Sequence, residues 1–275
     1  MTAPVVVGAD GSTPSLPALL WAAQAAMARD LPLVILHAAP HDGVQVLREA
    51  QALMHERFPG LPCTTVSANE SPAEALIDAS ATASLVVVGN RGHGGFHDLL
   101  LGSTSLHTAI HAHCPVAVVR PSVPGEGRDR IVVGVDATPH SHAALDLAFT
   151  EARRMGKAIT AVHAYISAIT AYPTGLMPQI PDLEADRARA KELLDGELLP
   201  WLTRYPDIDV EAEVAQGSAS SVLVQRSLGA NLVVVGSRGR GGFTGLLIGS
   251  ASHALIHHAG CPVLIAHHQH SDSNE

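Results

Sequence analysis

The chain has 275 residues, of which 47% are hydrophobic and only 3% aromatic, so its core must consist mainly of aliphatic side chains and alanine. Its formal net charge of −9 argues against a nucleic-acid partner, which would require clustered lysine and arginine. No apolar stretch approaches membrane-spanning length, so we expect no membrane partner. Three cysteines without paired spacing, and a first strand that begins at once, predict a cytoplasmic protein.

Predicted strands and helices alternate along the first 120 residues. Apolar runs predict strands at residues 4–9, 33–37, 85–88 and 116–119, and a polar strand is expected at 63–67. The segments between them predict helices at about 15–28 and 44–57, and from Ser71 and Ser103 onward. This order is typical of a parallel, doubly wound α/β sheet, which binds ligands beyond the carboxyl ends of its strands.

The remaining residues repeat this order. A segment rich in proline, glycine and charge at 121–129 predicts an exposed linker. Strands are expected at 131–135, near 210–214 and at 263–266, and a long helix from about 182 to 203. We therefore predict two tandem domains, with these limits: domain one 1–120, linker 121–129, domain two 130–268 and a disordered tail 269–275.

The spacing of matching residues locates one insertion. Asp10 matches Asp136 at an offset of 126, whereas Gly89 matches Gly236 at an offset of 147. The difference of 21 residues falls largely in 165–181, an apolar and proline-rich loop. Such loops are often lids or partner surfaces.

One motif occurs in both halves, as SLVVVGNRGHGGFHDLLLGSTS at 84–105 and NLVVVGSRGRGGFTGLLIGSASH at 231–253. A buried strand ends on a glycine, a second glycine follows, and a Gly-Ser opens a helix. Glycines expose backbone amides to a ligand, and a helix N-terminus attracts anions such as phosphate. A serine there can also cap the helix. The motif therefore predicts either a nucleotide-phosphate site or a pair of turns that bind no ligand.

Two other phosphate-binding motifs do not fit. The chain has no GxxxxGK[ST], so it is not a P-loop NTPase. A dinucleotide-binding GxGxxG would follow the first strand, whereas the glycine runs follow a late strand in each half. Arg91 and Arg238, between the first two glycines, either contact phosphate or lie on the surface.

The pattern G-x-x-G-x9-G-[S/T], preceded by VVVG and followed by a helix, Cys-Pro and a last strand, resembles the universal stress protein family. The resemblance covers about residues 4–120 and 130–267 and is greatest to tandem-domain, ATP-binding members. It implies an adenine nucleotide alpha hydrolase-like, Rossmann-like fold with five strands in each domain. It also implies ATP as the ligand, with Mg²⁺ as an accompanying ion left open.

The resemblance further implies which residues bind the nucleotide. Asp10 and Asp136 match an aspartate at the adenosine end of the site, although a turn or capping role is equally consistent with each alone. Ala38 and Ala164 match a position that meets adenine through its backbone. The expected nucleotide-binding residues are Asp10, Ala38, Gly89, Gly92, Gly102, Ser103, Thr104, Asp136, Ala164, Gly236, Gly239, Gly249, Ser250 and Ala251.

The two halves differ at positions near this motif. The first half has Asn90 where the second has Ser237, and Glu70 where the second has Gly217. Thr138-Pro139 is interpreted as the counterpart of Gly11-Ser12. These differences leave open whether the two sites bind equally well.

Neither a metal site nor a catalytic residue is predicted. His107 and His111, like His253 and His257, have helical i, i+4 spacing, but no cysteine or carboxylate stands at a completing spacing. Phosphoryl transfer needs positioned cations and a residue that orients the nucleophile, which the sequence does not display. Whether the protein is an enzyme is therefore uncertain, with weak ATP hydrolysis the most that we expect.

The leading functional hypothesis is an ATP-binding regulatory protein of the stress or dormancy response, acting on an unknown protein partner. A slow ATP hydrolase or phosphotransfer enzyme is the alternative, and a nucleotide-free scaffold or chaperone is disfavoured by the intact motif. The fifth strands of the two halves, 116–119 and 263–266, are predicted sheet edges. The resemblance implies that they pair as an intramolecular pseudo-dimer, with a homodimer left open.

Overall fold

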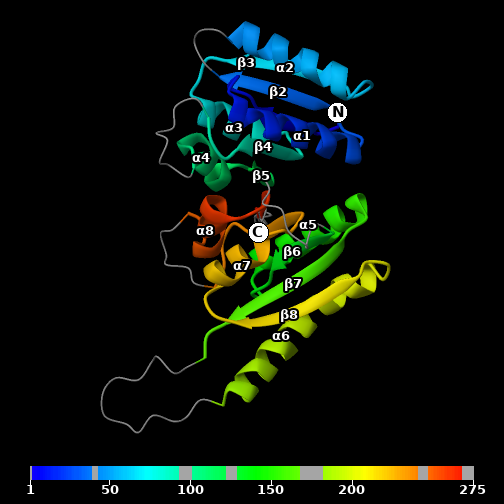
Figure 1. Ribbon diagram of the computed structural model, residues 1–275, viewed down its shortest axis with the longest axis vertical. Helices are drawn as coiled ribbons and strands as arrows, with labels where there is room; N and C mark the ends of the chain where they lie inside the picture. Colours follow the sequence, from blue (N-terminus) through cyan, green and yellow to red (C-terminus); the bar gives the residue numbers. More distant parts are fainter. Residues whose placement is uncertain are drawn as a thin grey trace, which may run out of the picture.

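The structure is a computed structural model that describes residues 2–38, 43–92, 101–121, 129–167, 182–240 and 247–267. Strands and helices alternate in both halves of the chain (Figure 1). The first half contains β1 Val5–Gly8, the short 3-10 helix η1 Thr13–Ser15, α1 Leu16–Ala28, β2 Leu33–Ala38, α2 Gly43–Arg57, β3 Cys63–Ala68, α3 Pro72–Ser80, β4 Leu85–Gly89, α4 Ser103–His111 and β5 Val116–Val119. The second half contains β6 Arg130–Gly134, α5 Pro139–Met155, β7 Ala158–Tyr165, α6 Leu183–Arg204, β8 Val210–Gln216, α7 Ala219–Ser227, β9 Leu232–Gly236, α8 Ser250–His258 and β10 Val263–Ala266.

One ten-stranded sheet runs through both halves in the order β3-β2-β1-β4-β5-β10-β9-β6-β7-β8. The strands of each half are parallel to one another, and β5 pairs antiparallel with β10, with Val118 opposite Val263. The predicted α/β fold, with two doubly wound halves of five strands, is confirmed. The expected pairing of the two fifth strands is present in the structure, and it places the halves end to end (Figure 1).

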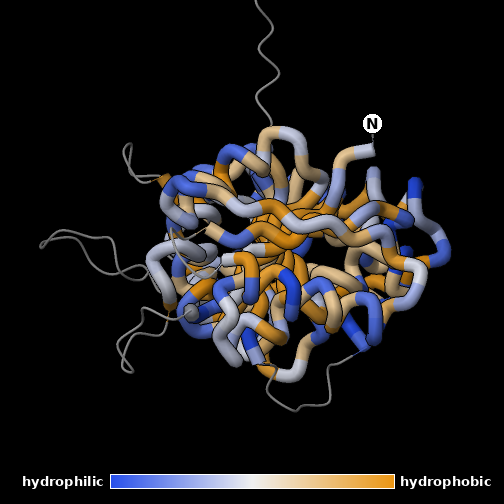
Figure 2. Tube along the Cα trace, turned by 90° about the horizontal axis from the view of Figure 1, so that it is seen from above, coloured by the Kyte–Doolittle hydropathy of each residue, from blue (hydrophilic) through white to orange (hydrophobic). Residues whose placement is uncertain are grey.

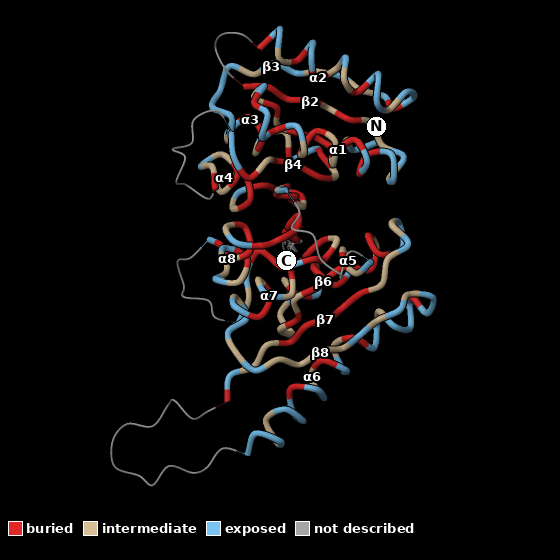
Figure 3. The backbone as a smooth tube through the Cα atoms, viewed as in Figure 1, coloured by how far each residue is buried: buried red, intermediate tan, exposed pale blue. Residues whose placement is uncertain are grey.

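Each face of the sheet has one hydrophobic core that is shared by both halves. Helices α1, α2, α5 and α6 contribute to the first core, and α3, α4, α7 and α8 to the second. The central strands are buried on both faces, as a parallel sheet covered by helices requires. Figure 2 shows apolar residues gathered between the two helix layers, and Figure 3 shows more exposed residues in β3 and β8 at the sheet edges.

A buried ion pair joins the two halves on one face. The Arg29 guanidinium, just after α1, lies 2.6 Å from the Glu151 carboxylate of α5, which also meets Arg154 at 2.8 Å. The Arg29 and Glu151 side chains are 5% and 1% exposed. Burial lowers the pKa of Arg29, and the Glu151 charge opposes that shift. The two halves therefore recognise each other through charge as well as through strand pairing.

A second pair of contacts crosses the junction beside β5 and β10. Arg120 donates to the carbonyl oxygens of Ile256 and His257 at the end of α8, at 3.5 and 3.2 Å. His267, at the matching position of the second half, lies 3.1 Å from the carbonyl oxygen of Ala109 near the end of α4. Each half thus contributes one side chain to the carboxyl end of the other half's last helix.

Several predictions lie outside the described residues. Most of the predicted linker, the loop residues 168–181 and the tail from 268 fall there, so these assignments and the domain limits stay predictions. Within the described ranges, no helix combines the length and apolar character needed to cross a membrane.

Candidate functional site

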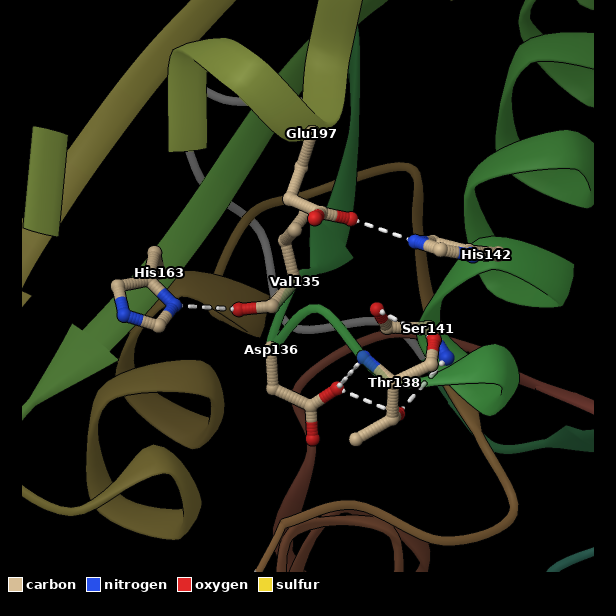
Figure 4. A network of polar contacts seen from close by, with 7 residues as sticks. All are labelled: Val135, Asp136, Thr138, Ser141, His142, His163 and Glu197. Atoms are coloured by element: carbon tan, nitrogen blue, oxygen red, sulfur yellow. Dashed lines mark hydrogen bonds and ion pairs between the residues drawn. The ribbon is translucent and has the colours of Figure 1, made fainter. Parts of the chain in front are cut away.

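In the second half, the Asp136 carboxylate organises the loop after β6 (Figure 4). Its Oδ1 accepts hydrogen bonds from the backbone N–H and the hydroxyl of Thr138, at 3.2 and 2.6 Å. The Thr138 hydroxyl oxygen in turn accepts from the backbone N–H of Ser141, which makes Thr138 the N-cap of α5. Asp136 therefore has the turn-closing role that was its alternative interpretation, at the point where β6 ends.

The same arrangement occurs after β1 in the first half. Asp10 Oδ1 accepts from the backbone N–H of Ser12 at 2.9 Å and from its hydroxyl at 2.6 Å. In both halves a buried histidine one strand away fixes the residue before the aspartate. His37 and His163 each place Nδ1 2.6 to 2.7 Å from the carbonyl oxygens of Ala9 and Val135. Because a carbonyl only accepts, Nδ1 is the donor in each ring.

The second glycine of each motif lies against this aspartate. A Cβ atom added to Gly92 would come within 2.4 Å of Asp10 Oδ2, and one added to Gly239 within 2.5 Å of Asp136 Oδ2. Asp136 Oδ2 also accepts a 3.0 Å hydrogen bond from the backbone N–H of Arg240. The glycine motif is therefore held against the loop of the first strand, at the switch in strand order between neighbouring β6 and β9.

The first glycine of each motif packs closely against neighbouring backbone. A Cβ atom at Gly236 would lie 2.6 Å from the backbone oxygen of His140, and one at Gly89 would lie 3.2 Å from that of Arg91. Neither glycine has a positive φ among the described residues. The glycines at this position are therefore explained by close packing and not by a turn that needs a positive φ, and their predicted contact with a nucleotide stays a prediction.

The third glycine begins the helix. Gly102 and Gly249 are the N-caps of α4 and α8, each in an extended conformation, and no side chain caps either helix. The expectation that Ser103 and Ser250 act as caps is wrong, because each takes the first helical position instead. Both serines are exposed. The first backbone N–H groups of a helix have no intrahelical acceptor, so this N-terminus is suited to an anion.

Sequence reasoning missed two serines that close the motif. Ser105 donates its hydroxyl to the carbonyl oxygen of Gly89, and Ser252 does the same to Gly236, both at 2.6 Å. The signal was present, because the two serines keep the same offset of 147 residues as the glycines. They tie the start of each helix to the end of the strand that precedes the motif.

The structure also corrects the match between the two halves after the aspartate. Ala137 has a φ of 57° and Gly11 a φ of 78°, so these two residues occupy the same left-handed position. Thr138 therefore corresponds to Ser12, and the interpretation of Thr138-Pro139 as the counterpart of Gly11-Ser12 is shifted by one residue. An alanine in this conformation is strained by about 1–2 kcal/mol relative to a right-handed residue.

The remaining predicted residues lie at the same edge of the sheet. Ala38 ends β2 and Ala164 lies near the end of β7, each directly after the histidine that fixes the aspartate loop. Thr104 and Ala251 occupy the second position of α4 and α8. The structure thus brings all fourteen predicted residues to the two carboxyl-end edges, one set in each half. Arg91 and Arg238 are exposed.

The histidine pairs do not form part of a larger ligand cluster. The rings of His107 and His111 lie 5.9 Å apart, and those of His253 and His257 lie 4.6 Å apart. Within the described ranges, no group of three or more histidine, cysteine, aspartate or glutamate residues is arranged to hold a metal ion.

Two of the three cysteines are core residues. Burial raises the pKa of the Cys114 and Cys261 thiols to about 12. A thiol with so high a pKa stays protonated and is a poor nucleophile. Cys63 is less deeply buried, and none of the three forms a disulfide.

Known proteins similar to this chain match it over nearly its whole length, including both halves. The model described as the universal stress protein family matches residues 1–56, 42–120 and 127–267. A universal stress protein of Mycolicibacterium smegmatis is 35% identical over 95% of this chain and 96% of its own length, and one of Mycobacterium tuberculosis has the same identity and coverage. The solved structure of a universal stress protein from Archaeoglobus fulgidus is 19% identical, with a TM-score of 0.63 and 98% of both chains covered. A putative universal stress protein from Pseudomonas aeruginosa, also 19% identical, has a TM-score of 0.69 and covers 96% of this chain and 93% of its own.

Proposed function

The chain belongs to the universal stress protein family, and from this we propose that each half binds one ATP at its aspartate and glycine motif. The observation that carries the proposal is the duplicated junction of an aspartate loop, a glycine motif and a helix N-terminus at one sheet edge. The triphosphate lies at the N-terminus of α4 or α8, where backbone N–H groups and the helix dipole stabilise negative charge. The adenosine lies toward Asp10 and Ala38, or toward Asp136 and Ala164.

ATP acts in this proposal as a regulatory ligand whose presence changes which protein partner is bound. The N-termini of α4 and α8 support the proposed phosphate site, and the described residues include no cluster that would position a metal ion for phosphoryl transfer. If Mg²⁺ accompanies ATP, phosphate oxygens and water supply most of its ligands, as is usual for this ion. We further propose a cytoplasmic location, which the three unpaired cysteines support.

Glutamate substitutions at the first helical position test the binding sites. Ser103 and Ser250 are exposed, and an acidic residue in the first turn is compatible with the helix dipole, so Ser103→Glu and Ser250→Glu are expected to fold. The added carboxylate repels phosphate. Calorimetry on the full chain is expected to show two ATP sites in the native sequence and one in each variant. Two sites in either folded variant would contradict the proposal.

The hydrolase alternative is tested by phosphate release from the same proteins. We expect fewer than about one turnover per minute, against ~10 per second for a typical enzyme. Sustained turnover that disappears in Ser250→Glu would favour the enzyme over the regulatory module.

A further inference from the structure

Helix α6 is longer than its counterpart in the first half. It has 22 residues, whereas α2 has 15. The offset of 147 that relates the glycine motifs also relates the last residues of the two helices, Arg57 and Arg204. The seven extra residues therefore lie at the start of α6, at 183–189, and are called the added turns below. Only four residues separate β2 from α2, so the first half has no counterpart of the added turns.

The added turns form one wall of a pocket of about 230 Å³ in the second half. His163, Tyr165 and Ile166 line it from the end of β7, Asp186 and Arg189 line it from the added turns, and Arg240 lines it from the glycine motif. His163 bonds to the carbonyl oxygen just before Asp136, and the Arg240 backbone bonds to the Asp136 carboxylate. The pocket therefore adjoins the aspartate, at the end of the site assigned above to adenosine.

The polar groups of this wall are held in place. Asp186 accepts hydrogen bonds from the Ser167 hydroxyl and from the Arg189 guanidinium. These bonds hold the pKa of Asp186 below its usual range, so the carboxylate stays ionised at neutral pH. Arg189 is 70% exposed and uses one of its nitrogens on Asp186. A guanidinium fixed in this way presents a flat, charged surface and spare N–H groups to an aromatic ring.

We propose that Arg189, held by Asp186, packs against the purine base in the second half and makes that site the tighter of the two. This proposal rests on the function proposed above. Contact between a guanidinium and an aromatic ring is expected to strengthen binding about tenfold when the guanidinium is desolvated by the ligand, and tenfold in affinity is about 1.4 kcal/mol. The hydrogen bond to Asp186 already restricts the Arg189 side chain, so part of the cost of immobilising it is met before the ligand binds.

Calorimetry on the full chain tests the proposal one site at a time. Ser103→Glu leaves the second-half site, and Ser250→Glu leaves the first-half site. We expect ATP to bind about tenfold more tightly to Ser103→Glu than to Ser250→Glu. Adding Arg189→Ala is expected to remove about this tenfold advantage and to leave the affinity of Ser250→Glu unchanged.

Two controls distinguish a lost contact with the purine base from other effects of Arg189→Ala on affinity. Arg187→Ala removes a guanidinium from the same added turns, but Arg187 lines a different hollow, between α6 and β8, and should have no effect. Inorganic tripolyphosphate has no base, so its affinity should be insensitive to Arg189→Ala. A nonspecific electrostatic effect would weaken tripolyphosphate as much as ATP and would overturn the proposal.

The failures of the two proposals are distinguishable. Each glutamate variant could lose one ATP while the remaining sites have equal affinity, or Arg189→Ala could have the same effect as Arg187→Ala. Either result would refute only the proposal that Arg189 makes the second-half site the tighter one. If neither glutamate variant loses a site, the proposed function fails and this inference fails with it.

Discussion

In the first half Asp10 holds Ser12, and in the second half Asp136 holds Thr138, through hydrogen bonds that agree within 0.3 Å. The surroundings of these two aspartates differ much more. In the first half four residues separate β2 from α2, whereas in the second half 17 residues separate β7 from the longer helix α6. The hydrogen bonds of the aspartate loop are thus nearly the same in both halves. The segment between the second strand and the second helix of each half differs, and there we expect the functional difference between the halves.

The largest expected effect concerns the junction between the halves. Glu151 has Ala25 as its counterpart in the first half, and Arg29 has Met155 in the second, so the ion pair occurs on one side only. Removing one partner of a buried pair leaves an uncompensated charge, so Glu151→Gln is expected to cost about 3–5 kcal/mol. Chemical denaturation of the full chain measures this cost. A change below about 1 kcal/mol, the range of exposed pairs, would show that the pair is solvated.

The first glycines of the two motifs are expected to differ in tolerance. In Gly236→Ala the new methyl meets the His140 backbone at 2.6 Å, whereas in Gly89→Ala it meets the Arg91 backbone at 3.2 Å. Overpacking costs about 1–3 kcal/mol, so we expect about 3 kcal/mol for Gly236→Ala and about 1 kcal/mol for Gly89→Ala. Thermal unfolding compares the two variants directly. Equal losses would contradict the packing difference between the halves.

Acidification is expected to weaken the junction through His267, whose counterpart is Arg120. Burial lowers the pKa of His267, and the nearby His140 and His113 add to this shift, while its bonds to carbonyl oxygens oppose it. His267 therefore binds a proton more readily in the unfolded chain than in the folded one. Its contribution to the free energy of unfolding is complete above the unfolded pKa of about 6.5 and decreases as the pH falls below that value. Melting temperatures between about pH 7.5 and 5 measure the slope.

His267→Gln is the control for this pH dependence, because it retains a donor for Ala109 but cannot titrate in this range. Its slope should be shallower than that of the native sequence. Some slope should remain, since burial and His253 also lower the pKa of His257. An unchanged slope would mean that His267 is not the responsible group.

The smallest expected effect is at the left-handed residue after each aspartate. Ala137→Gly relieves about 1–2 kcal/mol of strain and adds about 0.5–1 kcal/mol of chain entropy cost, so a net gain of about 0.5–1 kcal/mol is expected. Gly11→Ala should be destabilising, because its φ is 78° and a Cβ atom would lie 2.8 Å from Val46. Denaturation midpoints that move in the same direction for both variants would refute this match between the halves.

Much of the fold could be predicted because the central strands are continuous runs of valine and leucine that end at glycines. The strand β4, for example, was predicted at 85–88 and spans Leu85–Gly89. A pattern of this kind, an apolar run that ends at a glycine, depends only on residues that are close in sequence. The repeat then placed the aspartates and glycine motifs at one edge, since parallel strands bring their carboxyl ends together.

The sequence did not reveal features that depend on long-range packing or on single positions. The Arg29–Glu151 pair joins residues from different halves, and no local pattern links them. The cap positions at Gly102 and Gly249 lie one residue before the serines that a capping preference would select. The match of Ala137 to Gly11 was hidden because alanine rarely adopts a positive φ.

The number of ATP molecules bound to one intact chain tests the central claim most directly. Native mass spectrometry of the full-length protein in excess ATP is expected to show two nucleotides per chain, falling to none in the double variant Ser103→Glu, Ser250→Glu. A native chain that carries no ATP, or a folded double variant that still carries two, would contradict the account.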